Sequence, residues 1–311
     1  MQKIGILIET KDGEIKKANF GVITAARGED HKNLLQEFGI HKIVEIQSGN
    51  NLISYNPVSW SKAVSQAMDH FCISTLLGLA SIQGKNLLPR IAAGLNAPLV
   101  MDCSAVNLSE HTVQKSQFSG RAIATLKTVG PFHLYGIRPN AIEATPAPCD
   151  AETVSFQAEI ENDGLTVKEI KQSDYRGVDL SEADVILSGG RGLENSENFR
   201  VLFECAELMG ATVGSSRVAV DEGWVPYAMQ VGQTGKTVSP KVYIACGISG
   251  SVQHFAGMKT AAMIIAVNKD AGAAIMKQCD YFVVADLFEI IPALTKMLKE
   301  VANGDTTDLV E

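Results

Sequence analysis

Apolar residues in the first 110 positions recur in blocks that predict alternating strands and helices. Short runs such as Ile4–Ile8 are typical of buried strands, and longer stretches between them repeat apolar residues at helical spacing. Strands are expected at residues 4–8, 43–46, 72–77 and 98–101, and helices at residues 15–27, 57–70 and 85–95. Because proline removes a hydrogen bond inside a helix, we place Pro89 in the first turn of the last helix. The alternation indicates a parallel sheet covered by helices.

The pattern changes between residues 111 and 175, where short runs rich in β-branched and aromatic residues are separated by Gly, Pro or Asn. These runs predict additional strands of the first sheet, several of them antiparallel. They lie at residues 112–118, 121–128, 132–138, 153–160 and 166–170. The three prolines between Pro139 and Asp150 indicate a loop. The first domain, residues 1–176, is therefore expected to be a nucleotide-binding-like α/β domain with added strands.

A polar linker near residues 173–183 precedes a second and more regular α/β pattern, which we assign to residues 177–311. Its strands are expected at residues 185–187, 212–214, 242–246, 263–267 and 281–285, with long helices at 197–209 and 288–301. Every strand is followed by a turn and then by helical or irregular chain. The fold class expected for the whole protein is α/β with two domains, the second a doubly wound parallel sheet.

Polar or glycine-rich clusters follow the ends of all five strands in the second domain. They are residues 188–192 (SGGRG), 214–217 (GSSR), 247–254 (GISGSVQH), Asn268 and Asp286. In open parallel sheets, ligands bind outside the carboxyl ends of the strands. Five clusters at one edge indicate a long ligand with several polar groups, and a dinucleotide fits better than a small metabolite.

Residues 242–268 concentrate this signal. The strand Val242–Cys246 leads into the turn Gly247–Gly250 and then into a helix beginning near Ser251. This geometry presents backbone N–H groups to an anion. Gln253 and His254 follow in the first helical turn. The alternative is an ordinary glycine turn that joins a core strand to a core helix, because short glycine patterns recur by chance.

Each charged side chain near these turns has a structural alternative. Arg191 would bind a phosphate through its guanidinium, or lie free on the surface. Asp286 would accept a ribose hydroxyl, or cap the helix that follows it. Arg217 would contact an aromatic ring, and His254 would face a ring oxygen that becomes negative, or be a buried structural histidine.

One further loop, residues 230–236 (QVGQTGK), has neither strand nor helix periodicity. Gly232 and Gly235 bracket Gln233 and Thr234, whose amide and hydroxyl would bond the edge of a heterocycle. The alternative is a simple surface loop.

Composition and charge narrow the function classes. The chain has 311 residues, of which 46% are hydrophobic and 20% charged, as in ordinary globular proteins. A net charge of −8 argues against a nucleic-acid partner, and no apolar run approaches the roughly 20 residues of a membrane span. The six histidines form no closely spaced pair, so no metal site is expected. Since no export signal is visible, a cytoplasmic location is expected.

Taken together, the segments SGGRGL, GSSRVAVDEGW, MQVGQTGK, YIACGISGSVQHFAGM, AVNKD and VADLFE occur in this order. Residues 184–295 thereby resemble the alpha subunit of electron transfer flavoproteins. The stretch GKNLLPRIAAGL, which follows the first strands, is similar to the first domain of the same family. The resemblance covers nearly the whole chain.

The resemblance implies that the second domain binds FAD. Arg191 and the turn at Ser249, Gly250 and Ser251 would serve the pyrophosphate and ribityl parts. The flavin ring and ribityl chain would be contacted by residues from three segments: Ser216 and Arg217; Val231, Gly232, Gln233 and Thr234; Val252, Gln253 and His254. The adenosine side would be held by Asn268, Asp286 and Leu287.

The resemblance also implies a heterodimer with a beta subunit, contacted largely by the first domain. The protein would be an electron carrier rather than an enzyme. It would accept electrons from flavin dehydrogenases such as acyl-CoA dehydrogenases in fatty acid β-oxidation, and pass them to a membrane quinone oxidoreductase. Arg217 and His254 would stabilise the negative charge of the reduced ring. An electron-bifurcating complex and a regulatory subunit without redox chemistry remain as alternatives.

Overall fold

A computed structural model describes residues 3–11, 14–15, 19, 22, 42–48, 55–118, 122–143, 145, 152–160 and 179–302. The chain forms two compact units, one from within residues 1–174 and the other mainly from residues 175–311. The helix expected at residues 15–27 lies largely outside the described residues, and the strand expected at 166–170 lies wholly outside them. The boundary at residues 176/177 also falls outside them and stays a prediction.

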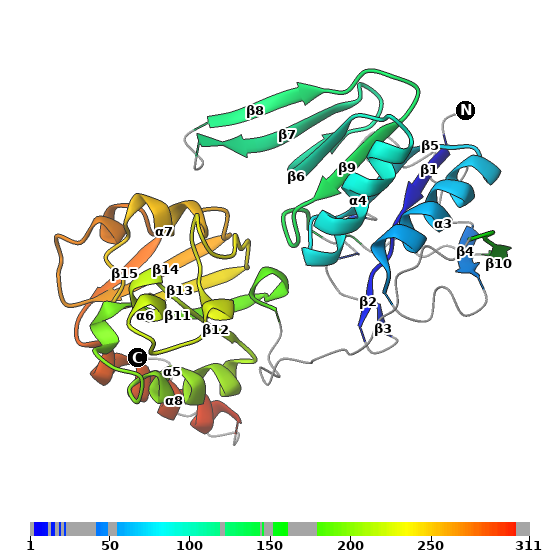
Figure 1. The fold of residues 1–311 in the computed structure, drawn as a ribbon. Coiled ribbons are helices and arrows are strands. Elements are labelled where there is room, and N and C mark those ends of the chain that lie inside the picture. The colour runs from blue at the N-terminus through cyan, green and yellow to red at the C-terminus, as the bar shows by residue number, and fades with distance from the viewer. Residues whose placement is uncertain are drawn as a thin grey trace. The chain divides into compact units, whose positions relative to one another are not determined.

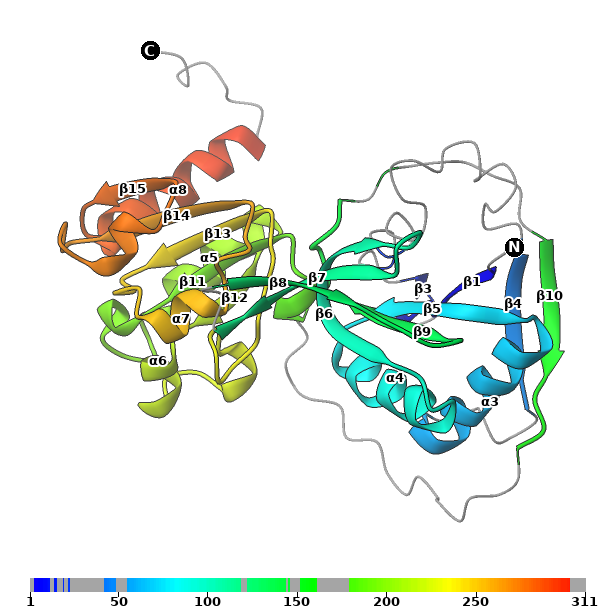
Figure 2. The same cartoon turned by 90° about the horizontal axis from the view of Figure 1, so that it is seen from above.

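The first domain contains a six-stranded mixed sheet. Its strands are β1 (Lys3–Ile6), β5 (Ile73–Leu79), β6 (Leu99–Asn107), β7 (Thr112–Gln117), β8 (Ala122–Lys127) and β9 (His133–Ile137). Their order in the sheet is β1-β5-β9-β6-β7-β8. The first four are parallel, and β7 and β8 extend the sheet in antiparallel fashion (Figure 2). Two further pairs are β4 (Lys42–Gln47) with β10 (Glu152–Gln157), which is parallel, and β2 (Thr10–Lys11) with β3 (Glu14–Ile15), which is antiparallel.

The prediction that the runs after residue 111 join the first sheet is confirmed for β7, β8 and β9 and is wrong for β10. β9 lies between β5 and β6 and is parallel to both. All five of its residues are buried, as expected for a central strand covered on both faces. β10 joins β4 in a separate pair. Only β7 and β8 are the added antiparallel strands, and β8 shows the partial exposure typical of a sheet edge.

Helices α3 (Pro57–His70) and α4 (Ile82–Gly94) cover one face of this sheet (Figure 2). The start of α3 at Pro57 is as predicted, and the Asn56 side chain caps it by accepting from the N–H of Val58. The start of α4 differs from the prediction, because the Ser81 hydroxyl caps it at the N–H of Gly84. Pro89 therefore lies inside the helix and not in its first turn. Its exposed position allows water to solvate the carbonyl that it leaves without a helical donor.

The second domain confirms the predicted doubly wound parallel sheet. Its strands are β11 (Val185–Gly189), β12 (Thr212–Ser215), β13 (Val242–Cys246), β14 (Met263–Asn268) and β15 (Tyr281–Val284). All neighbours are parallel, in the order β12-β11-β13-β14-β15. The first and third strands along the chain, β11 and β13, are therefore adjacent, and the connections leave in opposite directions at this switch point.

Both faces of this sheet are covered (Figure 1). The helices are α5 (Phe199–Met209), α6 (Arg217–Asp221), α7 (Val252–Ala256) and α8 (Leu287–Ala302). α5 and α8 pack on one face, where Leu187 and Ile244 meet Phe199 and Ile291 in one core. Tyr243 contributes to the core on the other face, the side of α7. Residues alternate between the faces because successive side chains of a strand point in opposite directions.

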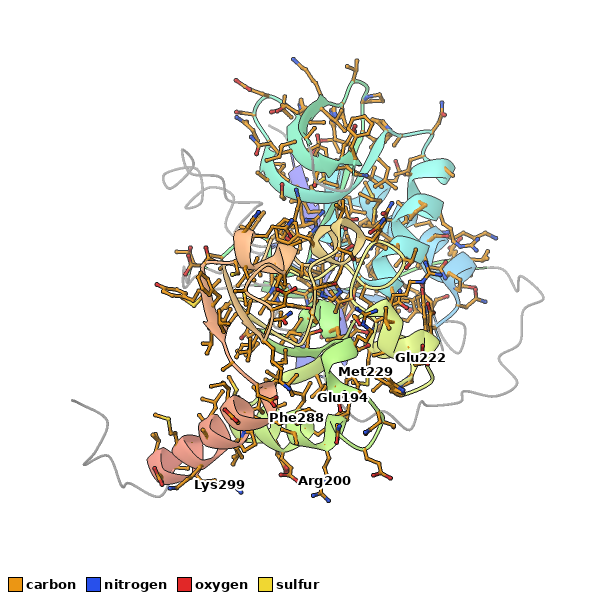
Figure 3. The ribbon with its side chains drawn as sticks, turned by 90° about the vertical axis from the view of Figure 1, so that its left-hand side faces the viewer. Glu194, Arg200, Glu222, Met229, Phe288 and Lys299 are labelled. Atoms are coloured by element: carbon orange, nitrogen blue, oxygen red, sulfur yellow. The ribbon has the colours of Figure 1, made fainter. Side chains whose placement is uncertain are left out.

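The outer surfaces of α5 and α8 carry charged side chains among exposed apolar ones. Arg200 and Lys299 project outward from these two helices in Figure 3. Among the described helices, none has the length and apolar character that crossing a membrane requires.

Candidate functional site

Two glycine turns meet at the switch point between β11 and β13. The N–H of Gly190 donates to the carbonyl of Cys246 at 2.9 Å, and the N–H of Gly192 donates to the carbonyl of Gly247 at 3.1 Å. A Cβ at Gly190 would lie 2.4 Å from the Gly247 oxygen. Only glycine therefore allows the two turns to approach so closely. Since ligands of open sheets bind beyond such strand ends, these turns mark the candidate site.

The second turn is held in shape by the rest of the domain. Gly250 has φ +79°, and a Cβ there would lie 2.5 Å from the nitrogen of Ile275. That nitrogen donates to the carbonyl of Ser249 at 3.1 Å. Ser249 and Ser251 are nevertheless exposed on the outer side of the turn. The turn is thus preformed, with its serines accessible to a ligand.

Helix α7 continues from this turn and separates exposed from buried side chains. The Ser251 hydroxyl accepts from the N–H of His254 at 3.4 Å and caps the helix. Val252 and Gln253 are exposed at its start. His254 is buried. Three of the four predicted ligand residues here thus lie on the surface, and the histidine lies beneath them.

The imidazole of His254 contacts a residue of the sheet. Its Nε2 atom lies 3.0 Å from the hydroxyl of Tyr243, a fully buried residue of β13. Its Nδ1 atom is buried and has no hydrogen-bond partner among the described residues. Burial lowers the pKa of His254 to about 4, although the backbone of Val231 opposes part of this effect. The ring is therefore neutral near pH 7.

The loop at residues 230–236 is not an isolated surface loop. The N–H of Val231 donates to the carbonyl of Ser215 at the end of β12, at 2.9 Å. The N–H of Gln233 donates to the carbonyl of Gln253 in α7, at 2.8 Å. Gly232 has φ +144°, and a Cβ there would lie 3.1 Å from that same carbonyl. The loop therefore bridges the end of β12 and α7.

The hydroxyl of Thr234 is oriented by this loop itself. It accepts a hydrogen bond from the Gln230 side chain at 2.9 Å, and the backbone carbonyl of Thr234 accepts from the Tyr227 hydroxyl. Gln230 is buried, so its amide is fixed in place. The hydroxyl hydrogen of Thr234 remains available to an acceptor.

Two predicted residues follow β12. The N–H of Ser216 donates to the carbonyl of Gly189 at 2.9 Å, which ties this segment to the first glycine turn. The Ser216 hydroxyl is buried without a hydrogen-bond partner among the described residues. Arg217 is exposed and pairs with Asp221 at 3.1 Å on the same short helix. Arg191, in the first glycine turn, is also exposed.

The last predicted residues hold the turns together from β14 and α8. Asn268 donates from its side chain to the carbonyl of Ile248 at 3.0 Å. Asp286 accepts from the N–H of Phe288 at 2.9 Å and pairs with Lys269, also at 2.9 Å. The hydrogen bond from Lys269 holds the pKa of the Asp286 carboxyl below its usual range. Asp286 thus caps α8, the structural alternative predicted for it, and one of its oxygens faces a cation.

Leu287 differs from its neighbours because its side chain belongs to the core. Its Cδ2 atom would lie 2.8 Å from a Cβ placed on Gly247. The side chain therefore supports the glycine turn from behind, and only its backbone is placed to meet a ligand.

The structure brings the predicted residues into two connected groups. The first surrounds the glycine turns and contains Arg191, Ser249, Gly250, Ser251, Asn268, Asp286 and Leu287. The second is built on α7 and contains Val231, Gly232, Gln233, Thr234, Val252, Gln253 and His254. Ser216 is bonded to the first glycine turn, and Arg217 follows it in the chain. The cap from Ser251 to His254 joins the two groups.

Sequence reasoning missed two residues of the site. Tyr243 lies within the strand predicted at residues 242–246 and had no predicted role in the site, although a buried tyrosine hydroxyl usually has a partner. Lys269 follows Asn268 and neutralises Asp286 across the strand ends. The role of Tyr243 could have been found in the sequence, because a tyrosine in an apolar strand needs a partner for its hydroxyl. The role of Lys269 depends on the adjacency of β14 and β15, which the sequence does not show.

The arrangement fits a dinucleotide cofactor. The second glycine turn presents accessible serines where a pyrophosphate would lie, as expected for helix-associated turns that bind phosphate. Two buried polar atoms near the strand ends, the Ser216 hydroxyl and His254 Nδ1, make no hydrogen bond of ordinary geometry within the described part of the chain, and buried polar atoms are nearly always hydrogen-bonded. A ligand with polar atoms along its length would satisfy both groups.

Comparison with known proteins identifies the family. The electron transfer flavoprotein domain matches residues 27–168, and the electron transfer flavoprotein FAD-binding domain matches residues 179–259. The electron transfer flavoprotein subunit alpha of Bacillus subtilis is 34% identical over 319 residues, covering 96% of this chain and 98% of that protein. That of Pseudomonas aeruginosa is 42% identical over 226 residues, covering 72% of each. Protein FixB of Clostridium saccharobutylicum is 34% identical over 331 residues, covering 97% of this chain and 98% of that protein.

The region matched by the FAD-binding domain contains both glycine turns and the loop at residues 230–236. FAD is therefore the cofactor of the second domain. The matches span both domains and agree with the architecture and with the preformed turns. The chain belongs to the electron transfer flavoprotein family and is similar over nearly its whole length to its alpha subunits.

Proposed function

We propose that this chain forms a cytoplasmic heterodimer with a beta subunit and carries electrons. The donors would be flavin dehydrogenases such as acyl-CoA dehydrogenases in fatty acid β-oxidation, and the acceptor a membrane quinone oxidoreductase. The observation that carries the proposal is the bond from Gln233 to Gln253, which joins the loop at residues 230–236 to α7. This bond brings the segment with the Gln233 amide and the Thr234 hydroxyl to the helix that carries the His254 imidazole. A carrier needs such polar groups near the flavin ring to adjust its reduction potential.

The two groups of residues support a division of the cofactor between them. The glycine turns and Arg191 would bind the pyrophosphate, with Asn268, Asp286 and the Leu287 backbone toward the adenosine. Ser216, Arg217 and the loop at residues 231–234 would lie along the flavin ring. Gln253 and His254 would meet the ribityl chain and the ring edge that becomes negative on reduction.

FAD supplies the site at which electrons are held. The chain's residues orient that site and stabilise negative charge there. Arg217 does so by its positive charge, which is released from Asp221 at little cost because exposed ion pairs are weak. His254 does so as a hydrogen-bond donor, because its buried ring is neutral. Preorganised donors of this kind contribute up to a few kcal/mol, about 2.7–4 for one donor in the best-studied cases.

The first domain offers a surface for the beta subunit. Ile123 of β8 and Val129 beyond it are 69% and 81% exposed. Ile123 belongs to the antiparallel extension of the sheet, and Val129 lies in the connection that follows it. Exposed apolar groups of this kind mark interaction surfaces when they are contiguous. We assign the contact with the beta subunit to this domain.

The test is to co-express the chain with an electron transfer flavoprotein beta subunit and to purify the complex. A carrier is expected to contain one FAD per heterodimer, to be reduced by an acyl-CoA dehydrogenase with its substrate, and to reduce a quinone oxidoreductase. Two FAD per heterodimer and reduction by a nicotinamide nucleotide would instead support the bifurcating alternative. A complex without flavin would overturn both.

A further inference from the structure

Tyr243 and His254 form a buried polar pair beneath the start of α7. The Tyr243 hydroxyl and His254 Nε2 are 3.0 Å apart, and the ring centroids are 6.1 Å apart at an angle of 61°. Tyr243 has no exposed surface, and His254 is 6% exposed. The pair links the sheet to the helix that follows the second glycine turn, because Tyr243 lies in β13 and His254 in α7.

Both members of the pair are neutral near pH 7. Burial raises the pKa of the Tyr243 phenol, so it keeps its proton. Burial lowers the pKa of His254 to about 4, so the imidazole carries a single proton. A neutral imidazole has one nitrogen that donates and one that accepts, and the hydrogen bond at one nitrogen decides the state of the other.

The chemistry of the two groups favours one direction for this bond. A phenol is a good donor and a poor acceptor, whereas the unprotonated nitrogen of imidazole is a good acceptor. The favoured bond therefore runs from the Tyr243 hydroxyl to His254 Nε2. The ring proton then lies on Nδ1, which is buried and makes no hydrogen bond of ordinary geometry among the described residues, although the backbone of Val231 interacts with the ring. The Nδ1 donor can therefore turn to an acceptor on a bound ligand.

We propose that Tyr243 is a positioning residue for the flavin, because its hydroxyl fixes His254 in the tautomer that carries a proton on Nδ1. The inference rests on the proposed function, in which His254 meets the negative edge of the reduced ring. In this tautomer His254 presents a donor to that edge. In the other tautomer it would present a lone pair, which repels negative charge.

The first test reads the tautomer of His254 in the unaltered protein. The complete heterodimer with FAD is prepared with ¹⁵N-labelled histidine, and long-range ¹H–¹⁵N spectra identify the tautomer of each neutral histidine. The His254→Asn variant assigns the signal. We expect the proton of His254 on Nδ1. A proton on Nε2 would show that Tyr243 accepts rather than donates, and would overturn the inference.

The second test removes only the hydroxyl. In the Tyr243→Phe heterodimer we expect the tautomer with a proton on Nε2 to become populated. The equilibrium constant for adding the first electron should fall roughly tenfold, equal to a decrease of about 59 mV in that potential. An unchanged tautomer together with an unchanged potential would contradict the positioning role.

Tyr135→Phe is the matched control. Tyr135 is also fully buried and lies in a strand of the first domain. Its hydroxyl is hydrogen-bonded to the Thr128 hydroxyl, with 2.6 Å between the two oxygens. Losing that hydroxyl should lower stability to a similar extent and leave both the histidine tautomer and the potential unchanged. A matching shift in the control would show that the effect comes from lost stability.

Failure of the proposed function gives a different result. If His254 does not face the flavin, its signals will not move when dithionite reduces the complex, whatever tautomer it has. If the proposed function holds and the inference fails, the signals will move on reduction but the tautomer will not depend on Tyr243. The two measurements therefore separate the two ideas.

Discussion

The backbone N–H of Gly190 donates to the carbonyl of Cys246 across the switch point of the second sheet, at 2.9 Å. This bond joins the turn after β11 to the end of β13, so two segments more than fifty residues apart act as one backbone surface. The contact is possible only because neither turn has a side chain between the two backbones. The first prediction concerns this contact.

Gly190→Ala should disrupt the site. The new Cβ would lie 2.4 Å from the Gly247 oxygen and 2.7 Å from a side-chain atom of Ile248, so the turns must separate. We expect a loss of about 1–3 kcal/mol in unfolding free energy, typical of overpacking, and weaker retention of FAD. Denaturant unfolding and the flavin absorbance of the purified complex measure these effects. Gly94→Ala is the control, because nothing lies within 4 Å of its Cβ position, and it should leave FAD binding unchanged.

Arg217→Ala should affect the cofactor more than the fold. Its pair with Asp221 is exposed, and such pairs contribute about 0.3–0.5 kcal/mol. We expect a small change in unfolding free energy but weaker FAD binding and a lower first reduction potential. Arg200→Ala is the matched control, since Arg200 forms the same kind of pair with Glu204 at 3.2 Å on α5. Equal effects of both substitutions on FAD would contradict a role for Arg217 at the ring.

Substitutions of Asp286 separate capping from cofactor binding. Asp286→Asn keeps an oxygen that can accept from the N–H of Phe288, whereas Asp286→Ala removes the cap and should lower the unfolding free energy. If Asp286 also binds the adenosine side, both variants should lose FAD affinity, measured by titration of the flavin-free complex. If Asp286→Asn binds FAD normally, the residue is only a cap.

His254 should make the flavin-free complex sensitive to acid. Its pKa in the fold is about 4 and its ordinary value is 6.5. Between these pH values, His254 is protonated in the unfolded chain but stays neutral in the folded protein. The unfolding free energy should fall as pH drops from 6.5 to 4, by about 3 kcal/mol from this group alone. Unfolding curves of wild type and His254→Asn across this range should therefore converge as pH falls. A constant difference between them would show that His254 titrates normally.

His254→Asn should also lower the potential for adding the first electron to the bound FAD. The asparagine is shorter and cannot be held by Tyr243 in the same place, so the donor at Nδ1 is lost. A loss of about 1–2 kcal/mol corresponds to a decrease of roughly 40–90 mV. Spectroelectrochemistry of the heterodimer measures it, and an unchanged potential would remove His254 from the ring edge.

Most of the second domain follows from local sequence. The five apolar runs are short, regularly spaced and followed by glycine or polar residues, so each strand and its carboxyl end are visible without tertiary information. The first domain was harder to predict from its sequence. The central position of β9 depends on which strands it pairs with, and its sequence resembles that of an added strand. Pro89 was misplaced because the cap at Ser81 begins the helix three residues before its apolar pattern is clear.

The sequence by itself determined the α/β class, the five strand ends and the residue types available to a dinucleotide, because these depend on local periodicity and turn chemistry. Only the tertiary structure decided which of these residues meet. The bridge from Gln233 to Gln253, the pairing of Asp286 with Lys269 and the pairing of Tyr243 with His254 join segments that are separate in the chain or lie on different elements. Burial determined the protonation state of His254, because the imidazole would titrate near its ordinary pKa in water and stays neutral inside the fold.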